Sequence, residues 1–390
     1  MKIYLVGGAV RDKRLGLPVQ ERDWVVVGAT PQQMLALGFQ AVGRDFPVFL
    51  HPQTKEEYAL ARTERKTGHG YTGFETFANP NITLEEDLLR RDLTINAMAE
   101  TTEGKLVDPY NGMDDLNNGV LRHVSEAFAE DPVRILRTAR FAARFAQWGF
   151  HVAHTTNALM RRMVKNGEAS HLVAERVWAE LVKALDTETP ARFFKVLAGC
   201  GALGVLFPEL VPADNNDTEN SHGEDAIALP VLQQAVTLSN LTTIRFAALA
   251  CDMDTMRPDG GSHDALASLC ERYKVPNACR DLARLALQQR RQLQTATRLS
   301  PEALLDLLNS IDAFRRAERF SELLKVCAAD SAVFQSACNS DYLLQALAAA
   351  QSVSTDELLQ QGLSGKDLGL ALHQQRIEAI RQLNKKVLSQ

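Results

Sequence analysis

Hydrophobic and polar positions follow two different patterns along the chain. Over residues 1–125, short β-rich apolar runs alternate with Gly, Pro and Asn turns, as in strands joined by tight connections. These runs lie at Ile3–Val6, Asp23–Val27, Pro47–His51, Tyr58–Ala61, Lys105–Asp108 and Val120–Val124. Helical spacing occurs between them at Pro31–Leu37 and Leu84–Arg90. The pattern predicts an α/β head with a mixed sheet.

From Asp131 onward, apolar residues recur at a spacing of about 3.6 with almost no strand signal. The clearest predicted helices are Asp131–Gln147, Thr155–Lys165, Val173–Leu185, Pro190–Ala198 and Ile227–Leu238. A polar run from Asp214 to Glu224 and a cluster from Asp254 to Gly261 are the expected loops or subdomain boundaries. We therefore expect an all-α remainder, with a neck and body over residues 126–210 and a tail over residues 211–390.

Composition limits the class of protein. A chain of 390 residues with 45% apolar residues can bury two or three cores. Its 43 basic and 48 acidic residues give a net charge of −5, so a nucleic-acid site would have to be a local patch. The sequence has no apolar run approaching the roughly 18 residues of a membrane span, no signal peptide and no CxxC pair among its 6 cysteines. We expect a cytoplasmic protein with reduced thiols and no membrane partner.

A Gly-Gly turn and a carboxylate pair are the first candidates for chemistry. Gly7 and Gly8 follow an apolar strand and precede a predicted helix, where backbone N–H groups can approach a phosphate. Glu21 and Asp23 are two residues apart at the start of the next strand, so both carboxylates project from one face. Such oxygen ligands suit Mg²⁺. An isolated pair is more often a solvated strand edge, but the nearby Gly-Gly turn favours metal-assisted phosphoryl transfer.

A second candidate follows the acidic start of a predicted helix. Adjacent Arg90 and Arg91 can bind a triphosphate or a ribose, and we expect Arg91 to face the nucleotide. The alternative is that these arginines pair with Glu86 or Asp87 at helical spacing. Asp92 is a further polar group for the sugar or the turn.

The third candidate is a basic stripe on one helix. Asp131 and Pro132 form a favourable helix start. Much of the remaining helix surface is apolar, so the helix is expected to be buried and its arginines to need anionic partners. This favours a phosphate-binding wall over a solvated, salt-bridged stripe. The stripe consists of Arg134, Arg137, Arg140 and Arg144.

Together, five segments resemble the class II CCA-adding enzymes of the polymerase-β nucleotidyltransferase superfamily. They are LVGGAVRD (5–12), ERDWVVVG (21–28), RRDLTINAMA (90–99), DPYNGMDDL (108–116) and EDPVRILRTARFAARF (130–145). The resemblance implies a nucleotidyltransferase head followed by helical neck, body and tail segments. It also implies that CTP and ATP are added as C, C and A to the 3′ end of tRNA without a nucleic-acid template.

The resemblance also implies roles for individual residues. Glu21 and Asp23 would be the catalytic carboxylates that hold Mg²⁺. Asp131 and Arg134 occupy the positions of the family's amino-acid template for the incoming base, where a carboxylate accepts from the exocyclic amine of cytosine or adenine. Residues 63–73 match the family's flexible loop, or form only a hairpin tip. The other expected nucleotide-binding residues are Gly8, Arg11, Arg91, Arg137 and Arg140.

The second half departs from longer relatives that carry an HD phosphohydrolase domain. Its metal site needs an early histidine, an adjacent His-Asp pair and a later aspartate. Here Cys251 precedes Asp252 where the pair is expected, and residues 228–232 contain no histidine. His222 and His263 lie in predicted polar loops and are expected to be solvent groups. We predict that phosphohydrolase activity is lost and that this region is a helical scaffold.

Other functions remain open at this point. A poly(A) polymerase would share the head and add only ATP, and a partial enzyme would add only CC or only A. A non-catalytic RNA-binding protein could use an inactive transferase scaffold, although the retained carboxylates and arginines argue against it. The sequence does not determine the oligomeric state or which helices contact the tRNA.

Overall fold

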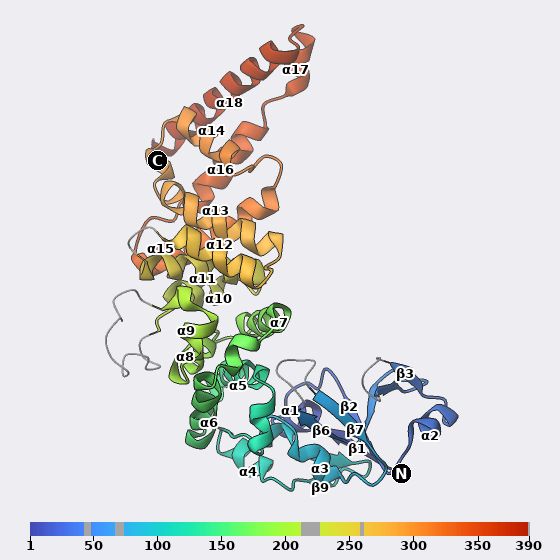
Figure 1. Cartoon of the computed structure of the whole chain (residues 1–390). Helices are drawn as coiled ribbons and strands as arrows, with labels where there is room; N and C mark the ends of the chain where they lie inside the picture. The colour runs from blue at the N-terminus through green and yellow to red at the C-terminus, as the bar shows by residue number, and fades with distance from the viewer. Residues whose placement is uncertain (43–47, 67–73, 212–226, 258–260, 389–390) are drawn as a thin grey trace. The chain divides into compact units, whose positions relative to one another are not determined.

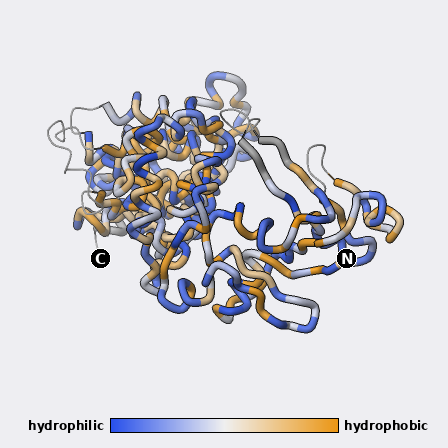
Figure 2. The backbone as a smooth tube through the Cα atoms, turned by 60° about the horizontal axis from the view of Figure 1, so that its bottom comes forward, coloured by the Kyte–Doolittle hydropathy of each residue, from blue (hydrophilic) through white to orange (hydrophobic). Residues whose placement is uncertain are grey.

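The computed structural model describes residues 1–42, 48–66, 74–211, 227–257 and 261–388 (Figure 1). Within these residues the chain divides into two compact units, 1–211 with Ile227 and 228–388. Hydrophobic residues are distributed along the whole chain and are not confined to one segment (Figure 2).

The head contains a seven-stranded sheet in the order β3-β4-β5-β2-β1-β8-β9. The pairing of β2 with β5 is parallel, and the other pairings are antiparallel. The mixed sheet predicted from the sequence is confirmed. Its strands are β1 (Lys2–Val6), β2 (Asp23–Val27), β3 (Gln40–Val42), β4 (Val48–Leu50), β5 (Glu57–Leu60), β8 (Ala99–Thr101) and β9 (Leu106–Val107).

Strand β2 separates two hydrophobic clusters, because successive side chains of a strand point to opposite faces. Val25 belongs to one cluster, which also contains Leu84 and Leu88 of α3 (Leu84–Leu89). Val26 belongs to the other, which contains Met34 of α2 (Pro31–Ala36). Both helices begin with a capping box, so local sequence signals fix their starts.

Several short elements of the head were not predicted. Strands β3 and β8 have only three residues each, too few for a periodic signal. Strands β6 (Arg62–Lys66) and β7 (Phe74–Ala78) pair with each other as an antiparallel hairpin. Residues 67–73 of the expected flexible loop lie outside the described residues. Helix α4 (Gly112–Asn117) was also missed.

The rest of the first unit is helical, as predicted, with one exception. Strand β11 (His151–Val152) pairs in parallel with β10 (Val120–Leu121). This two-residue ladder depends on a tertiary contact and has no sequence period of its own. Helix α5 packs against α7 and α8. The helices are α5 (Val133–Arg144), α6 (His154–Lys165), α7 (Ala174–Leu185), α8 (Ala191–Gly199) and α9 (Ala202–Leu206).

In the second unit all the regular elements described are helical. The expected loop at Asp254–Gly261 is partly wrong, because α11 continues to Met256 and includes Asp254. The expected loop at 214–224 lies outside the described residues. A helix able to span a bilayer is not found in the described parts of the chain. The helices are α10 (Pro230–Leu238), α11 (Thr242–Met256), α12 (Ser262–Arg272), α13 (Asn277–Gln294), α14 (Pro301–Ser310), α15 (Ala317–Phe334), α16 (Ser340–Gln351), α17 (Thr355–Gln360) and α18 (Gly365–Leu388).

Gly112 at the start of α4 generates a prediction for stability. A Cβ at this position would lie 2.2 Å from the carbonyl oxygen of Thr94, so Gly112→Ala forces the backbone apart. We expect a loss of about 1–3 kcal/mol in the free energy of unfolding, measured by denaturant titration. Gly204→Ala is the matched control, because a Cβ there has no neighbour within 4 Å. The control should be neutral or slightly stabilising, and equal losses in both variants would contradict the steric explanation.

Candidate active site

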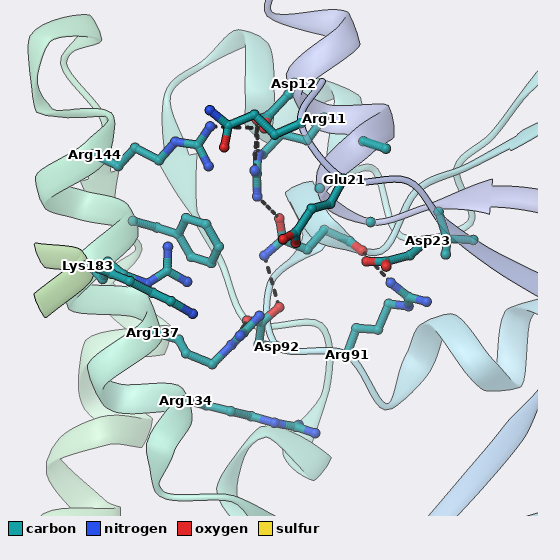
Figure 3. A pocket seen from close by; sticks show the side chains of 18 of the residues that line it. Arg11, Asp12, Glu21, Asp23, Arg91, Asp92, Arg134, Arg137, Arg144 and Lys183 are labelled. Carbon is teal, nitrogen blue, oxygen red and sulfur yellow. Dashed lines mark hydrogen bonds and ion pairs between the residues drawn. The ribbon is translucent and has the colours of Figure 1, made fainter. Parts of the chain in front are cut away.

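A pocket of about 1040 Å³ opens between the head sheet and helices α5 and α7. Figure 3 shows Glu21 and Asp23 on one side of it and arginines of α5 on the opposite side. All the site residues expected from the sequence line this pocket. They are Gly8, Arg11, Glu21, Asp23, Arg91, Asp131, Arg134, Arg137 and Arg140.

The register of the two central strands brings the Gly-Gly turn next to the carboxylate pair. β1 and β2 are antiparallel, and Val6 at the end of β1 lies opposite Asp23 at the start of β2. Gly7 follows with a φ of 71°, which favours glycine. A Cβ on Gly7 would lie 2.8 Å from Nη1 of Arg91. Gly7 therefore permits both the turn and the close approach of Arg91, whereas Gly8 begins α1 (Gly8–Arg14).

Glu21 and Asp23 both line the pocket, although only Asp23 belongs to the strand. The pocket walls raise the pKa of Asp23, and the negative charge of Glu21 raises it further, whereas Arg91 lowers it; the net shift is upward. Two carboxylates that repel each other are stabilised by a shared cation. Their hard oxygen atoms fit a divalent metal ion. Within the described residues no group of three or more His, Cys, Asp or Glu could hold a metal, so water or a bound phosphate would complete the coordination.

A buried polar chain connects α1 to α5 through the segment after α3. Arg11 donates to Oδ1 of Asn96 (2.5 Å), and Asn96 donates to Oδ1 of Asp92 (3.0 Å). The other carboxylate oxygen of Asp92 accepts from Nε of Arg137 at 2.7 Å. Burial opposes the charge of Asp92, but Arg137, Asn96 and the N–H of Leu93 hold its pKa well below the usual range. Asp92 is therefore ionised and fixes the orientation of Arg137.

Arg90 and Arg91 share one buried carboxylate, as the alternative interpretation of the sequence proposed. Oδ1 of Asp87 contacts Arg90 at 2.8 Å, and Oδ2 contacts Arg91 at 3.3 Å. Arg90 also donates to the carbonyl oxygen of Arg62. Arg91 lies beside Gly7 and contributes to the lowering of the pKa of Asp23. An ion pair with Asp87 thus holds Arg91 at the pocket.

Asp131 performs the predicted capping of α5 and has a second partner. Its Oδ1 accepts from the N–H of Val133 at 3.1 Å. Arg176 of α7 binds both carboxylate oxygens, with Nη1–Oδ1 at 3.0 Å and Nη2–Oδ2 at 2.8 Å. Arg134 is 8% exposed and donates to the backbone carbonyls of Ala127 and Arg90. The orientations of Asp131 and Arg134 are therefore set by the protein.

The other arginines of the stripe also have carboxylate partners. Arg140 is 9% exposed and donates to Oε2 of Glu180 at 2.5 Å. Arg144 donates to Oδ2 of Asp12 at 3.0 Å. The prediction that these arginines need anions holds, but protein carboxylates supply them. Arg137, Arg140 and Arg144 of the stripe are thus salt-bridged, and Arg134 is held by backbone carbonyls. Their guanidinium groups are oriented at the pocket wall.

The charged pocket residues Asp12, Arg176 and Lys183 were not identified as site residues from the sequence. Glu180, which does not line the pocket but is the partner of Arg140, was also missed. Arg176 and Glu180 are four residues apart on α7, so they occupy one helix face. That spacing was the available signal, but their partners, Asp131 before α5 and Arg140 on it, depend on how the two helices pack.

Two family models match the chain. Residues 3–122 match the "Poly A polymerase head domain". Residues 149–214 match the "Probable RNA and SrmB- binding site of polymerase A".

Similar proteins match over nearly the whole length. A multifunctional CCA protein of Thioalkalivibrio sulfidiphilus is 53% identical, covering 98% of each chain. One of Pseudoalteromonas atlantica is 48% identical, covering 97% of this chain and 99% of the relative. Among solved structures, a Thermotoga maritima CCA-adding enzyme complexed with tRNA has a TM-score of 0.66 at 21% identity, covering 100% of this chain and 91% of that one. A CCA-adding enzyme with ATP gives 0.66 at 21%, covering 100% and 89%. These structures share the polymerase-type head and helical body.

The Asp92 network generates a prediction for stability. Asp92→Asn removes the charge that Arg137 needs, and we expect a loss of about 1–3 kcal/mol in the free energy of unfolding. Because the pKa of Asp92 is depressed, its contribution is present at neutral pH and is lost only as the pH falls below the usual range for aspartate. Denaturant titrations between about pH 6 and 8 should therefore give a constant difference from wild type. Glu126→Gln, which removes an exposed pair with Arg162, is the control; an equal loss there would contradict the prediction.

Proposed function

The chain belongs to the multifunctional CCA protein family, and on this basis we propose that it adds and repairs the 3′-terminal CCA of tRNA with CTP and ATP. No nucleic-acid template is needed. In each step the terminal ribose 3′ oxygen forms a bond to the α-phosphorus of the nucleotide, and pyrophosphate leaves.

One observation supports this proposal above the others. One pocket contains a carboxylate pair at the start of β2 and, across from it, oriented arginines of α5 (Figure 3). Phosphoryl transfer needs charge stabilisation on both sides of the reacting phosphate, together with accurate positioning. The arrangement therefore suits a nucleoside triphosphate better than a neutral ligand.

A divalent metal is expected for the family, and we propose that it is Mg²⁺ held by Glu21 and Asp23. Burial raises the pKa of Asp23, and the charge of Glu21 adds to this against the opposing effect of Arg91. A divalent cation between the two carboxylates would offset both effects. When bound, the ion would supply Lewis acidity at the ribose hydroxyl and neutralise charge on the triphosphate. Cytoplasmic localisation is part of the proposal.

The surrounding residues would bind and orient the nucleotide. Arg11, Arg91, Arg137 and Arg140 present guanidinium groups, which bind phosphate oxygens in bidentate geometry. The turn at Gly8 lets the backbone lie close to the same ligand. Because each of these arginines already has a protein partner, little side-chain freedom would be lost on binding.

Asp131 and Arg134 would select the base. The carboxylate can accept from the exocyclic amine of cytosine or adenine, while the guanidinium donates to the adjacent ring nitrogen. Uracil and guanine present a carbonyl oxygen at that position, which repels the carboxylate. Oδ2 of Asp131 accepts from Arg176, and a carboxylate oxygen can take a second donor. The Asp131 carboxylate is thus fixed without being saturated.

The central prediction concerns the reaction itself. Purified protein, tRNA lacking CCA and Mg²⁺ should give CC with CTP alone and complete CCA with CTP and ATP together. Asp23→Ala should abolish incorporation, with a loss of at least about 10³-fold because metal binding is lost. Products are resolved on sequencing gels.

The same assay separates the alternatives. Homopolymeric A tails with ATP alone would identify a poly(A) polymerase, and products that stop at CC would identify a partial enzyme. Unchanged incorporation by Asp23→Ala would disprove the metal role. Binding of tRNA without any incorporation would support the inactive RNA-binding alternative.

A second prediction tests the base template through Arg176. Arg176→Gln frees the Asp131 carboxylate to rotate, so discrimination should fall by about 10-fold or more, as expected for one base contact. The measurement is kcat/KM for CTP against UTP and for ATP against GTP. Arg162→Gln, which removes an exposed arginine from α6, should retain full discrimination. A uniform fall for all four nucleotides would instead indicate a general structural defect.

A further inference from the structure

The second unit contains a buried group of carboxylates that the transferase site does not use. Three of its helices, α11, α13 and α15, pack against one another. Asp252 and Asp254 lie on α11, and Asp330 lies on α15. Asp252 and Asp330 are 0% and 3% exposed. Buried carboxylates of this kind need a cation or strong hydrogen-bond donors.

A guanidinium from α13 supplies the cation. Nη2 of Arg290 contacts Oδ2 of Asp254, and Nε lies 3.7 Å from Oδ1 of Asp330. The Arg290 side chain is only 6% exposed. Burial opposes its charge, but Cys251, Asp330 and Asp254 raise its pKa, so it remains a cation. One arginine thus connects the carboxylates of two different helices.

The carboxylates are oriented toward protein donors. Oδ1 and Oδ2 of Asp252 accept from the N–H groups of Val231 and Leu232 at 3.0 and 2.8 Å, at the start of α10. Oδ2 of Asp330 accepts from Gln294 at 2.6 Å. Oδ1 of Asp330 has no hydrogen-bond partner among the described residues. That oxygen lies nearest Arg290, which compensates its charge.

Cys251 adds a group that is poorly suited to a metal. Metals bind the thiolate form of cysteine. Burial raises the pKa of Cys251 to about 12, despite the opposing effect of Arg290. The thiol is therefore protonated at neutral pH and borders the guanidinium.

We propose that Arg290 is the permanent cation of this cluster and occupies the place that a divalent metal would need among these carboxylates. Its positive charge also repels any metal ion that approaches the same oxygens. Arg290 of α13 then joins Asp254 of α11 and Asp330 of α15 in a structural ion-pair network. Asp252 is held separately, by the N–H groups at the start of α10. This cluster therefore offers no site for metal-dependent phosphohydrolysis. Cys251 and Asp252 occupy the positions where the histidine–aspartate pair of such a site is expected. The inference is independent of the proposed transferase activity.

The first experiment measures metal binding in the full chain. Glu21→Ala/Asp23→Ala removes the carboxylates proposed to bind metal in the head, so that remaining binding reports on the second unit. With Arg290 present, equilibrium dialysis should detect no stoichiometric Mn²⁺ or Ni²⁺ up to millimolar concentrations. Stoichiometric binding of either ion, lost on Asp252→Asn/Asp330→Asn, would overturn the proposal.

The second experiment removes the cation in the same background. Arg290→Ala should lower the thermal midpoint by about 5 °C or more. Buried Asp330 loses its cation, and Asp254 keeps only Ser262 and the exposed Arg291. Mn²⁺ or Ni²⁺ should raise the midpoint of this variant but not that of the protein with Arg290. The control is Arg316→Ala, which removes an exposed pair with Asp312 in the same unit and should change neither property.

Two further outcomes would also overturn the proposal. One is an Arg290→Ala variant as stable as Arg316→Ala. The other is a metal-induced rise in midpoint that is equal with and without Arg290. If Arg290→Ala does not fold, Arg290→Lys keeps the charge and serves in its place. The lysine variant should fold and, like the protein with Arg290, bind no stoichiometric Mn²⁺; stoichiometric binding would contradict the role of the charge.

Discussion

The ion pair between Asp92 and Arg137 is the interaction on which the geometry of the pocket depends. It joins the segment after α3 to helix α5 at 2.7 Å. Through Asn96 the same carboxylate reaches Arg11 beside the Gly-Gly turn. A buried charge requires its partner at a defined distance, so this contact fixes the arginine face of α5 relative to the sheet that carries the proposed metal ligands.

The remaining arginines of the pocket follow the same principle. Most are held by a protein carboxylate, as in the pairs of Arg91 with Asp87 and of Arg140 with Glu180. Arg134 is held by backbone carbonyl groups instead. A protein without these partners would have to order long, flexible side chains during binding, at a cost in entropy. Pre-oriented arginines suit an enzyme whose chemistry consists of positioning and charge stabilisation.

The two units use buried charge for different purposes. In the first unit, paired charges surround an open pocket that can admit an anionic ligand. In the second, Arg290 fills the carboxylate cluster from within. The difference is consistent with one nucleotidyl-transfer centre and a helical scaffold. The same difference agrees with the departure from the phosphohydrolase pattern at Cys251. Where that pattern has a metal-binding histidine, this chain has a cysteine, and the proposed cation of the neighbouring carboxylates is Arg290.

The sequence by itself determined the mixed α/β head, the helical remainder and many of the residues that line the pocket, but not Arg176 or Lys183. Those features depend on local periodicity, capping signals and motif spacing, as at Asp131 before α5. Only the tertiary structure decided the partners of charged groups that lie far apart in the sequence. The pairing of Arg176 with Asp131 spans 45 residues, and that of Arg290 with Asp254 spans 36. No sequence period encodes such contacts, because they arise when separate helices pack and bring buried charges together.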